Sequence, residues 1–232
     1  MSDFVQQQHT ICNFSNEESW VILSPIEQSI KQKIESVGTP LKDWDIKIYR
    51  GVLTGYNDAF IISTEKRDEI LANCQTEEER IRTAELIRPI LRGRDIKRYG
   101  YDWANLWLIN THNGIKGVKP RIDVNDYPAI KAHLDQYWDK ISKRADKGDT
   151  PYNLRNCAYL DDFFKPKVMW KIIGCNINFS FDNGIMICNN AVNIMTGDRD
   201  QLLQFLGLMN SKLFDWYLKL TTEAEVQGGG IQ

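Results

Sequence analysis

The sequence of 232 residues predicts a mixed α+β fold, with a mainly antiparallel β core flanked by helices and a long helix near the C-terminal end. Strand-like stretches concentrate in residues 44–63 and 166–196, and patterns of helical periodicity precede, separate and follow them. Because strands and helices do not alternate regularly, a doubly wound parallel sheet is disfavoured. We expect an N-terminal linker and helix over residues 1–40, followed by one domain over residues 41–232.

The first predicted helix begins after Ser24. This serine is suited to the N-cap, Pro25 to the first helical position, and Glu27 completes a capping box three residues on. Four apolar residues then share one helical face: Ile26, Ile30, Ile34 and Val37. The sequence at 38–40, Gly-Thr-Pro, ends the helix. A short buried strand is predicted ahead of it at residues 20–23.

Two strands are predicted within residues 44–63, joined by a glycine-containing turn at 51–55. Two short helices follow, one after Thr64 and one capped by Thr76. Pro89 is expected to end the second helix, because proline interrupts helical hydrogen bonding.

A strand at residues 106–109 and a basic, glycine-containing loop at 112–121 come next. Apolar residues at spacings of four, four and three predict a helix over 127–145, with Asp126 available as its cap.

The segment 166–196 predicts four strands, and Asn183-Gly184 is a strong signal for a hairpin turn within it. One last helix is predicted from Asp198 to about Leu220. Its buried side would carry six apolar residues: Leu202, Leu206, Met209, Leu213, Trp216 and Leu220.

The composition is typical of a soluble globular protein, with 42 % hydrophobic residues and a formal net charge of -2. No apolar run approaches the roughly 20 residues that a membrane helix needs, and residues 1–9 do not resemble a signal peptide. The five cysteines are an odd number without a Cys-x-x-Cys pair, and there are only three histidines. We therefore expect a cytoplasmic protein with reduced cysteines, no membrane contact, and neither a disulfide framework nor a zinc site.

The small net charge hides an uneven distribution. Residues 92–171 contain 16 basic and 10 acidic residues, a net of +6, whereas the rest of the chain contains 13 basic and 21 acidic residues, a net of -8. Such asymmetry indicates a surface that faces a polyanion.

Motifs of self-contained enzymes are absent from the sequence: it has no dinucleotide-binding or Walker glycine loop, no His-Glu-x-x-His and no Gly-x-Ser-x-Gly. The Asn-Pro-Pro-Tyr type of tetrapeptide, with which adenine methyltransferases hold a flipped base, is absent as well. We therefore predict no catalytic and no metal-binding residues. A metal nuclease that uses Asp95 and Lys97 ranks third among the hypotheses, since Asp-x-Lys occurs twice, about as often as chance allows.

Four basic clusters lie in the positive segment, and the densest is Arg92 to Tyr99, with four cations and one anion in its first seven residues. Guanidinium groups suit phosphate oxygens and guanine edges. Each cluster alone could equally be solvated surface charge, but together they favour a shared binding face. The candidate contacts are Arg92, Arg94, Lys97, Arg98, Asn113, Lys116, Lys119, Lys165, Lys167 and Lys171.

Several motifs occur together in a characteristic order. They are Gly51-x-x-Thr54-Gly55-x-Asn57-x-Ala59-Phe60, Ile87-x-Pro89-Ile90-Leu91-Arg92-Gly93-Arg94-Asp95, Tyr152-x-Leu154-Arg155, Phe164-Lys165-Pro166-Lys167 and Leu206-x-x-Met209-Asn210-Ser211-Lys212. In this order they resemble the TaqI-like C-terminal specificity domain, the target-recognition domain of Type IIG restriction-modification enzymes and adenine-specific DNA methyltransferases.

The resemblance implies a module that reads double-stranded DNA, mainly in the major groove. A methyltransferase domain of the same parent chain would then flip and methylate an adenine with S-adenosylmethionine. Magnesium is a further candidate cofactor for a parent that also cleaves DNA. We expect this chain to be a fragment whose domain is truncated at the C-terminal end and has no activity alone. The alternative from another class is a protein-protein scaffolding module that docks through the apolar C-terminal helix.

Overall fold

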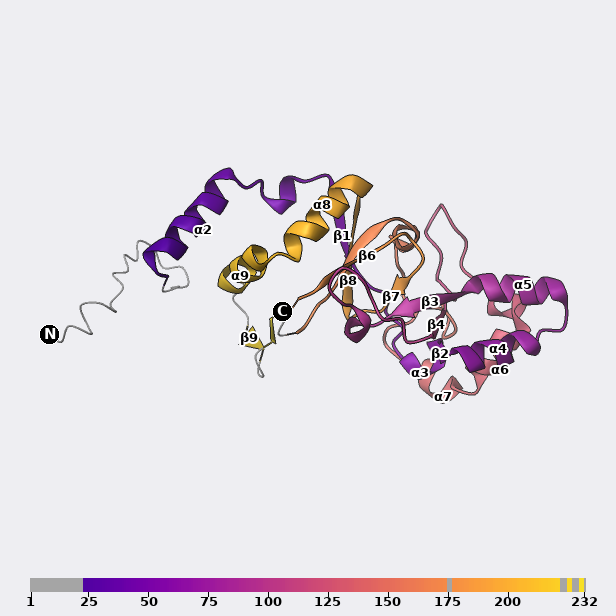
Figure 1. The fold of residues 1–232 in the computed structure, drawn as a ribbon. Helices are drawn as coiled ribbons and strands as arrows, with labels where there is room; N and C mark the ends of the chain where they lie inside the picture. Colours follow the sequence, from indigo (N-terminus) through magenta and orange to yellow (C-terminus); the bar gives the residue numbers. More distant parts are fainter. Residues whose placement is uncertain (1–22, 175–176, 222–224, 227–229, 232) are drawn as a thin grey trace.

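The computed structural model describes residues 23–231, apart from 175–176, 222–224 and 227–229. The ribbon is elongated, with two β-sheets (the β body) in the middle and a helical lobe at one end (Figure 1). Helices α2 (Pro25–Val37) and α9 (Lys212–Thr221) lie at the other end. The predicted strand at 20–23 lies outside the described residues except for Leu23, which is buried.

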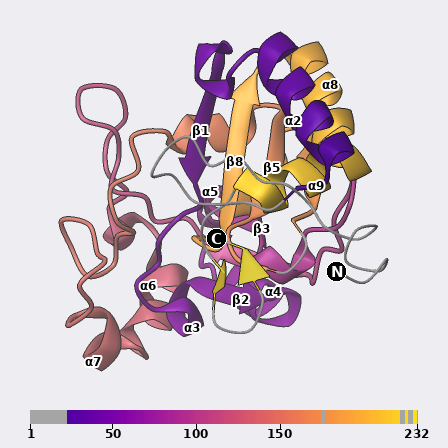
Figure 2. The same ribbon diagram turned by 90° about the vertical axis from the view of Figure 1, so that its left-hand side faces the viewer.

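The first sheet has four antiparallel strands in the order β1-β8-β5-β6. Their bounds are Ile46–Arg50, Val192–Gly197, Lys167–Lys171 and Phe179–Asp182, respectively. Helix α8 (Arg199–Met209) contacts β5, β6 and β8 (Figure 2). This contact buries a compact apolar cluster: Val168, Phe179, Met195, Leu202, Phe205 and Leu206.

The second sheet has the order β2-β4-β3-β7. Its strands span Ile61–Ser63, Leu106–Ile109, Ile87–Leu91 and Ile187–Cys188. The β3–β7 pair is parallel and the others are antiparallel. Buried side chains of both sheets join one core, and each contributes about 1.5–3 kcal/mol of stability by leaving water. The mixed, mainly antiparallel fold class is therefore confirmed.

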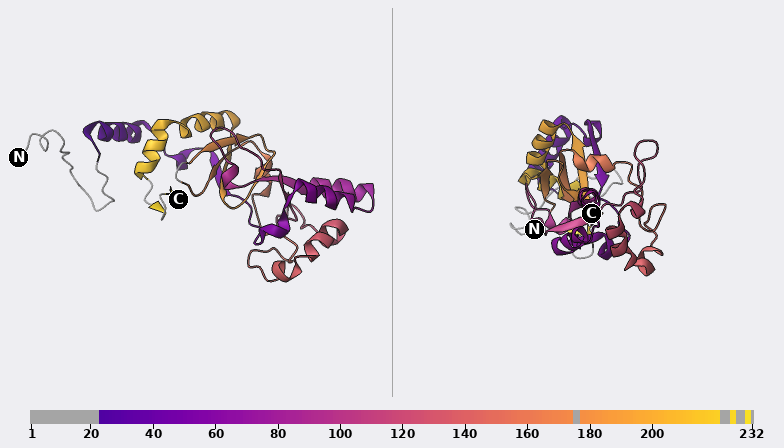
Figure 3. Two further views of the ribbon diagram at one scale, coloured as in Figure 1. Left: turned by 60° about the horizontal axis from the view of Figure 1, so that its bottom comes forward. Right: turned by 90° about the vertical axis from the view of Figure 1, so that its right-hand side faces the viewer.

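The helices of the lobe cover one end of this second sheet and project away from α2 (Figure 3). They are α3 (Asn57–Phe60), α4 (Thr64–Ala72), α5 (Glu77–Leu86), α6 (Pro128–Asp135) and α7 (Trp138–Ile141). Thr76 caps α5 as predicted, because its side chain accepts a hydrogen bond from the N–H of Glu79 at 3.1 Å.

The prediction that Pro89 ends a helix is wrong. Helix α5 already ends at Leu86, and Pro89 lies inside strand β3 opposite Trp107. On the other side of β3, strand β7 pairs only with Ile90 and Leu91. The hydrogen-bond ladder is thus one-sided at Pro89, a position that tolerates a residue without an N–H.

The single helix predicted over 127–145 is two short helices, with Tyr127 rather than Asp126 at the N-cap of α6. The break lies at Tyr137, whose φ of -107° and ψ of 12° are not helical. Its ring packs against Tyr56 and His133, with centroids 6.1 and 5.4 Å away. Tertiary packing of this tyrosine therefore overrides the helical spacing.

The predicted long C-terminal helix is likewise divided, into α8 and α9 (Lys212–Thr221). Asn210 lies at the break. Its side chain accepts from the N–H of Phe179 at 3.1 Å and donates to the carbonyl oxygen of the same residue at 2.8 Å. An asparagine that bonds a neighbouring strand in this way competes with helix continuation.

The predicted hairpin at Asn183-Gly184 is a turn between the two sheets, because β6 belongs to the first sheet and β7 to the second. Gly184 has a φ of +93°, which disfavours any residue with a side chain. The carboxylate of Asp182 accepts N–H hydrogen bonds from Gly184, Ile185 and Met186 at 2.9, 2.9 and 3.2 Å, which holds the turn.

The first predicted helix is confirmed as α2 (Pro25–Val37), and both bonds of the capping box are present. Its apolar face is nevertheless uncovered: Ile26 is 70 % exposed and Val37 is 75 % exposed. The polar side of α2 faces α9, where Glu35 accepts a hydrogen bond from the Tyr217 hydroxyl at 3.4 Å.

Two further expectations concern cysteines and membranes. Cys74, Cys157 and Cys188 are free, and Cys12 and Cys175 lie outside the described residues. Within the described part of the chain, no helix combines the length and apolarity required for a membrane span.

Candidate nucleic-acid interface

A groove of about 860 Å³ lies at the ends of strands β1 and β5, beside the turn that follows β7. Five cationic side chains line it: Arg50, Arg92, Arg94, Lys97 and Lys171. Four amide side chains accompany them: Asn57, Asn178, Asn189 and Asn190. No carboxylate of the described residues belongs to this lining. The groove is therefore positive and rich in hydrogen-bonding groups.

The floor of the groove is a short 3₁₀ helix, Gly93–Asp95, held by an ion pair. Arg92 donates to both carboxylate oxygens of Asp95 at 2.8 and 3.0 Å, and its backbone N–H donates to the same carboxylate at 2.8 Å. Burial alone would raise the pKa of Asp95, but the bonds from Arg92 outweigh it and lower that pKa below its ordinary value.

This pair contradicts the nuclease hypothesis. A metal at Asp95 would have to displace the guanidinium of Arg92 from both oxygens. Among the described residues, no group of three His, Cys, Asp or Glu side chains could hold a metal ion. Through this ion pair Arg92 holds the 3₁₀ helix in place, and because it also lines the groove it is a candidate contact as well.

Arg94 and Lys97 are exposed, as the sequence analysis expects of DNA contacts. Lys97 donates to the carbonyl oxygen of Arg94 at 3.3 Å and lies 3.7 Å from the carboxylate of Asp102. Arg98 behaves differently, because it donates to the backbone carbonyl of Asn210 at 2.5 Å and does not line the groove. Its part in the structure is to tie this segment to the end of α8.

A second hollow, of about 730 Å³, lies under the loop at residues 113–121. Gly114 and Gly117 have φ values of +74° and +75°, so the tight turns of this loop depend on glycine. Asn113 is committed internally: its amide donates to the Asp149 carboxylate at 3.0 Å and accepts from the Asp149 N–H at 2.8 Å.

The two lysines of this loop differ in their partners. Lys119 lies 3.4 Å from the carboxylate of Asp161, whereas Lys116 forms no hydrogen bond or ion pair with the described residues. Lys116 is therefore the loop cation most available to an external anion.

A third, smaller hollow has lining residues in common with both. It shares Asn156 and Cys157 with the hollow under the loop and Arg50 with the groove, and Arg155 also lines it. We call the three together the basic trough. Nine cations line the trough, namely Arg50, Arg92, Arg94, Lys97, Lys116, Lys119, Arg121, Arg155 and Lys171. Asp149 is the one carboxylate among its described lining residues.

Two lysines predicted as contacts lie outside the trough. Lys165 is 58 % exposed and forms an ion pair of 2.5 Å with Asp162. Lys167 is fully buried, and its ammonium donates to the carbonyl oxygen of Phe163 at 2.6 Å and to Asp182 at 2.5 Å. No phosphate can approach a buried ammonium that already has two partners, so the structure does not support a contact role for Lys167.

Arg50 and Arg155 line the trough but were not predicted as individual contacts from the sequence. Both are isolated cations with no basic neighbour within two residues, so a search for charge clusters does not find them. Only the convergence of β1 with the segment at 155–159 brings them to the trough. The glycine that follows Arg50 lets the end of β1 lie close to the turn after β7, because a side chain on Gly51 would overlap the backbone of Asn189.

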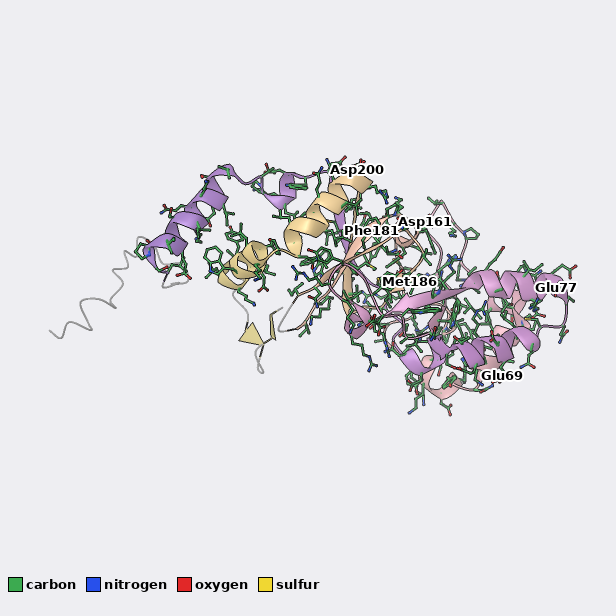
Figure 4. All side chains as sticks on the ribbon, in the orientation of Figure 1. Glu69, Glu77, Asp161, Phe181, Met186 and Asp200 are labelled. Carbon is green, nitrogen blue, oxygen red and sulfur yellow. The ribbon has the colours of Figure 1, made fainter. Side chains whose placement is uncertain are left out.

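The acidic surplus of the chain lies elsewhere. Figure 4 labels Glu69 and Glu77 on α4 and α5, at the outer end of the helical lobe. The other two labelled acids are Asp161, near the loop that carries Lys119, and Asp200 at the start of α8. Glu69 and Glu77 do not line the trough, whereas Asp161 pairs with Lys119 beside it.

Comparison with known proteins gives a consistent picture. The profile of the TaqI-like C-terminal specificity domain matches residues 88–228, more than half of the chain. No curated protein matches the sequence significantly.

Among solved structures, the Type IIL restriction-modification enzyme MmeI in complex with DNA matches 73 % of this chain, with a TM-score of 0.51 and 13 % identity. The type IIG restriction endonuclease BpuSI matches 80 % of it, with a TM-score of 0.47 and 14 % identity. The matches cover 21 % and 22 % of those two chains, so this chain spans about a fifth of their length. Because the identity is only 13 %, the similarity to MmeI is a similarity of fold alone.

Proposed function

Because the chain belongs to the family of TaqI-like C-terminal specificity domains, we propose that it recognises the target sequence of a restriction-modification enzyme in double-stranded DNA. The basic trough is the proposed DNA-binding surface. The observation that carries the proposal is that nine cations line three hollows that share lining residues, and that the side chains of four of these cations form no ion pair with a described residue. Phosphate contacts from such a surface supply affinity, and polar groups within it can reach base edges.

The number of available cations sets the expected strength of the salt effect. Four of the nine have side chains that form no hydrogen bond or ion pair with the described residues: Arg50, Arg94, Lys116 and Lys171. Four phosphate contacts correspond to a slope of about -3.6 in a plot of log K against log salt. Binding should therefore weaken by about 100-fold between 50 and 200 mM salt.

The test uses this chain and a library of duplexes with a randomised central segment. We expect salt-dependent binding with about this slope and enrichment of a defined sequence after selection. Arg94→Glu should weaken binding to selected and random duplexes alike, whereas Arg80→Glu on the distant helix α5 should not. Binding that is independent of salt, or selection that enriches no sequence, would contradict the proposed function.

We also propose that the chemistry belongs to other domains of the parent chain, which would act as an N6-adenine methyltransferase in the bacterial cytoplasm, with or without endonuclease activity. S-adenosylmethionine does not suit the trough of this chain, because the cofactor carries a positive sulfonium and the trough is lined by cations. We assign the cofactor, and magnesium in a parent that cleaves DNA, to those domains.

The uncovered face of α2 is the proposed contact with the methyltransferase domain. Three of its apolar side chains, Ile26, Ile30 and Val37, are 70, 38 and 75 % exposed. Exposed apolar surface of this kind marks interaction sites. In the complete parent enzyme, Ile26→Asp should uncouple methylation from DNA binding. Gln32→Asp, on the opposite side of the same helix, should not.

The second candidate function is a protein-protein scaffold. The sequence predicted that it docks through the C-terminal helix, where Leu208 and Leu213 are 50 and 48 % exposed, and α2 adds another exposed apolar surface. A scaffold would bind its partner through these apolar surfaces and would show no selection of DNA sequence. Ile26→Asp would then abolish all function, while Arg94→Glu would abolish none.

A further inference from the structure

Some polar side chains of the groove are already committed to the protein itself. Arg92 is bonded to Asp95, and Asn57 accepts from the Thr54 hydroxyl at 2.6 Å. Asn189 accepts from the backbone N–H of Ala191 at 3.2 Å. These side chains shape the groove and have reduced capacity for a ligand.

Five others form no hydrogen bond or ion pair with any described residue. Three are cations, Arg50, Arg94 and Lys171, and two are neutral amides, Asn178 and Asn190. The two chemistries serve different tasks on DNA. A cation attracts phosphates of any sequence, whereas an amide offers one acceptor and two donors at fixed angles and has no net charge.

The amide pattern matches one base in particular. In the major groove, adenine presents N7 as an acceptor beside an N6 amino donor, and an asparagine amide can bond both at once. Resting on the DNA-binding function proposed above, we propose that Asn178 and Asn190 are the base-reading residues of the groove and that they select adenine. Arg50, Arg94 and Lys171 then hold the phosphates on either side.

The backbone around Asn190 is held on both sides, as base reading requires. The carbonyl of Asn189 accepts from the N–H of Val192 at 3.0 Å, and the carbonyl of Ala191 accepts from the N–H of Ile172 at 3.0 Å. The N–H of Asn189 itself donates to the carbonyl of Leu91 at 2.9 Å. The turn that carries Asn190 is thus tied to segments of both sheets, and the position of its backbone is determined before DNA binds.

Asn178 is held in a comparable way through the residue that follows it. Phe179 is bonded at both its N–H and its carbonyl by the side chain of Asn210. Its carbonyl also accepts from the N–H of Tyr99 at 2.8 Å. Both amides are thus carried by hydrogen-bonded backbone and lie beside cations whose side chains have no partner among the described residues. Such a surface can discriminate between base sequences, whereas cations alone attract the phosphates of any sequence.

The experiment compares Asn178→Ala and Asn190→Ala with Arg94→Gln, using the full chain and the same randomised duplex library. Each alanine variant should lose preference for adenine by about 10- to 100-fold at one or two base pairs. Its affinity for random duplex should change less than twofold, and its salt slope should not change. Arg94→Gln should instead weaken all sequences equally and reduce the slope by about 0.9. Thermal unfolding should be unaltered in both alanine variants, since neither side-chain amide forms a hydrogen bond with a described residue.

Two outcomes overturn the inference while the proposed function stands: a wild-type preference that survives both alanine substitutions, or variants that weaken every sequence equally. Loss of preference for a base other than adenine would overturn the assignment of the base alone. The failure of the proposed function itself looks different, because the wild-type chain would then select no sequence and show no salt-dependent binding.

Discussion

The ammonium of Lys167 and the carboxylate of Asp182 meet at 2.5 Å inside the protein, with both side chains fully buried. The two residues are directly opposite each other on strands β5 and β6. The same carboxylate holds the turn that leads from the first sheet to the second. It also accepts a hydrogen bond from the Tyr101 hydroxyl at 3.1 Å, and burial together with this carboxylate raises the pKa of Tyr101 to about 12.

Breaking this pair should destabilise the fold. Lys167→Met leaves a buried carboxylate without its counter-ion, and loss of one partner of a buried pair costs about 3–5 kcal/mol. The free energy of unfolding, measured by urea denaturation, should fall by that amount. The control Lys165→Met, two residues earlier, removes an exposed lysine and should change stability far less. Equal effects of the two variants would contradict the structural role of Lys167.

Arg144 should resist replacement even by lysine. Its guanidinium is buried and donates to the carbonyl oxygens of Thr54, Asp146, Pro151 and Asn153, above the ring of Phe60 at 4.3 Å. Burial lowers its pKa to about 10, so it stays charged at neutral pH.

A lysine ammonium cannot reach four carbonyls that match the guanidinium fork. We expect Arg144→Lys to reduce the free energy of unfolding by about 2–4 kcal/mol. Lys143→Arg, on the exposed neighbour, is the matched control and should have no measurable effect. A stable Arg144→Lys variant would show that the four carbonyl bonds contribute little.

Arg50 should contribute one phosphate contact. Arg50→Gln removes a cation that is shared by two of the three hollows, so the slope of log K against log salt should become shallower by about 0.9. The comparison variant is Arg80→Gln, whose side chain is 55 % exposed on α5 and paired with Glu77. Fluorescence anisotropy with a random duplex at four salt concentrations gives both slopes. An unchanged slope in Arg50→Gln would place DNA away from the middle of the trough.

Cys157 should react slowly although it lines the trough. Burial raises the pKa of its thiol to about 11, so the reactive thiolate is disfavoured in the folded protein. At pH 8, roughly 0.1 % of this thiol is ionised, against about a quarter of an unperturbed cysteine.

Alkylation of Cys157 should therefore be about 200-fold slower in the native than in the urea-unfolded chain, followed by peptide mass spectrometry. The native rate should rise about tenfold for each unit between pH 8 and pH 10, because the thiolate fraction does so below the pKa. Native alkylation as fast as that of the unfolded chain would contradict the buried state of the thiol.

The capping and periodicity signals predicted helix α2 and the start of α5, because both depend on residues three or four positions apart. The same local signals failed at Tyr137 and Asn210. At both breaks the residue contacts a distant segment, the ring of Tyr56 in one case and the backbone of Phe179 in the other. The spacing of apolar residues along the chain does not predict contacts with segments far away in the sequence.

By itself the sequence determined the mixed fold class, the resemblance to its family and the positive character of residues 92–171. The tertiary structure alone decided which cations can meet DNA. It buried Lys167, turned Arg98 toward Asn210 and brought the isolated Arg50 to the centre of the trough. The physical reason is that charge is a property of a residue, whereas its availability to a phosphate depends on burial and partners from elsewhere in the chain.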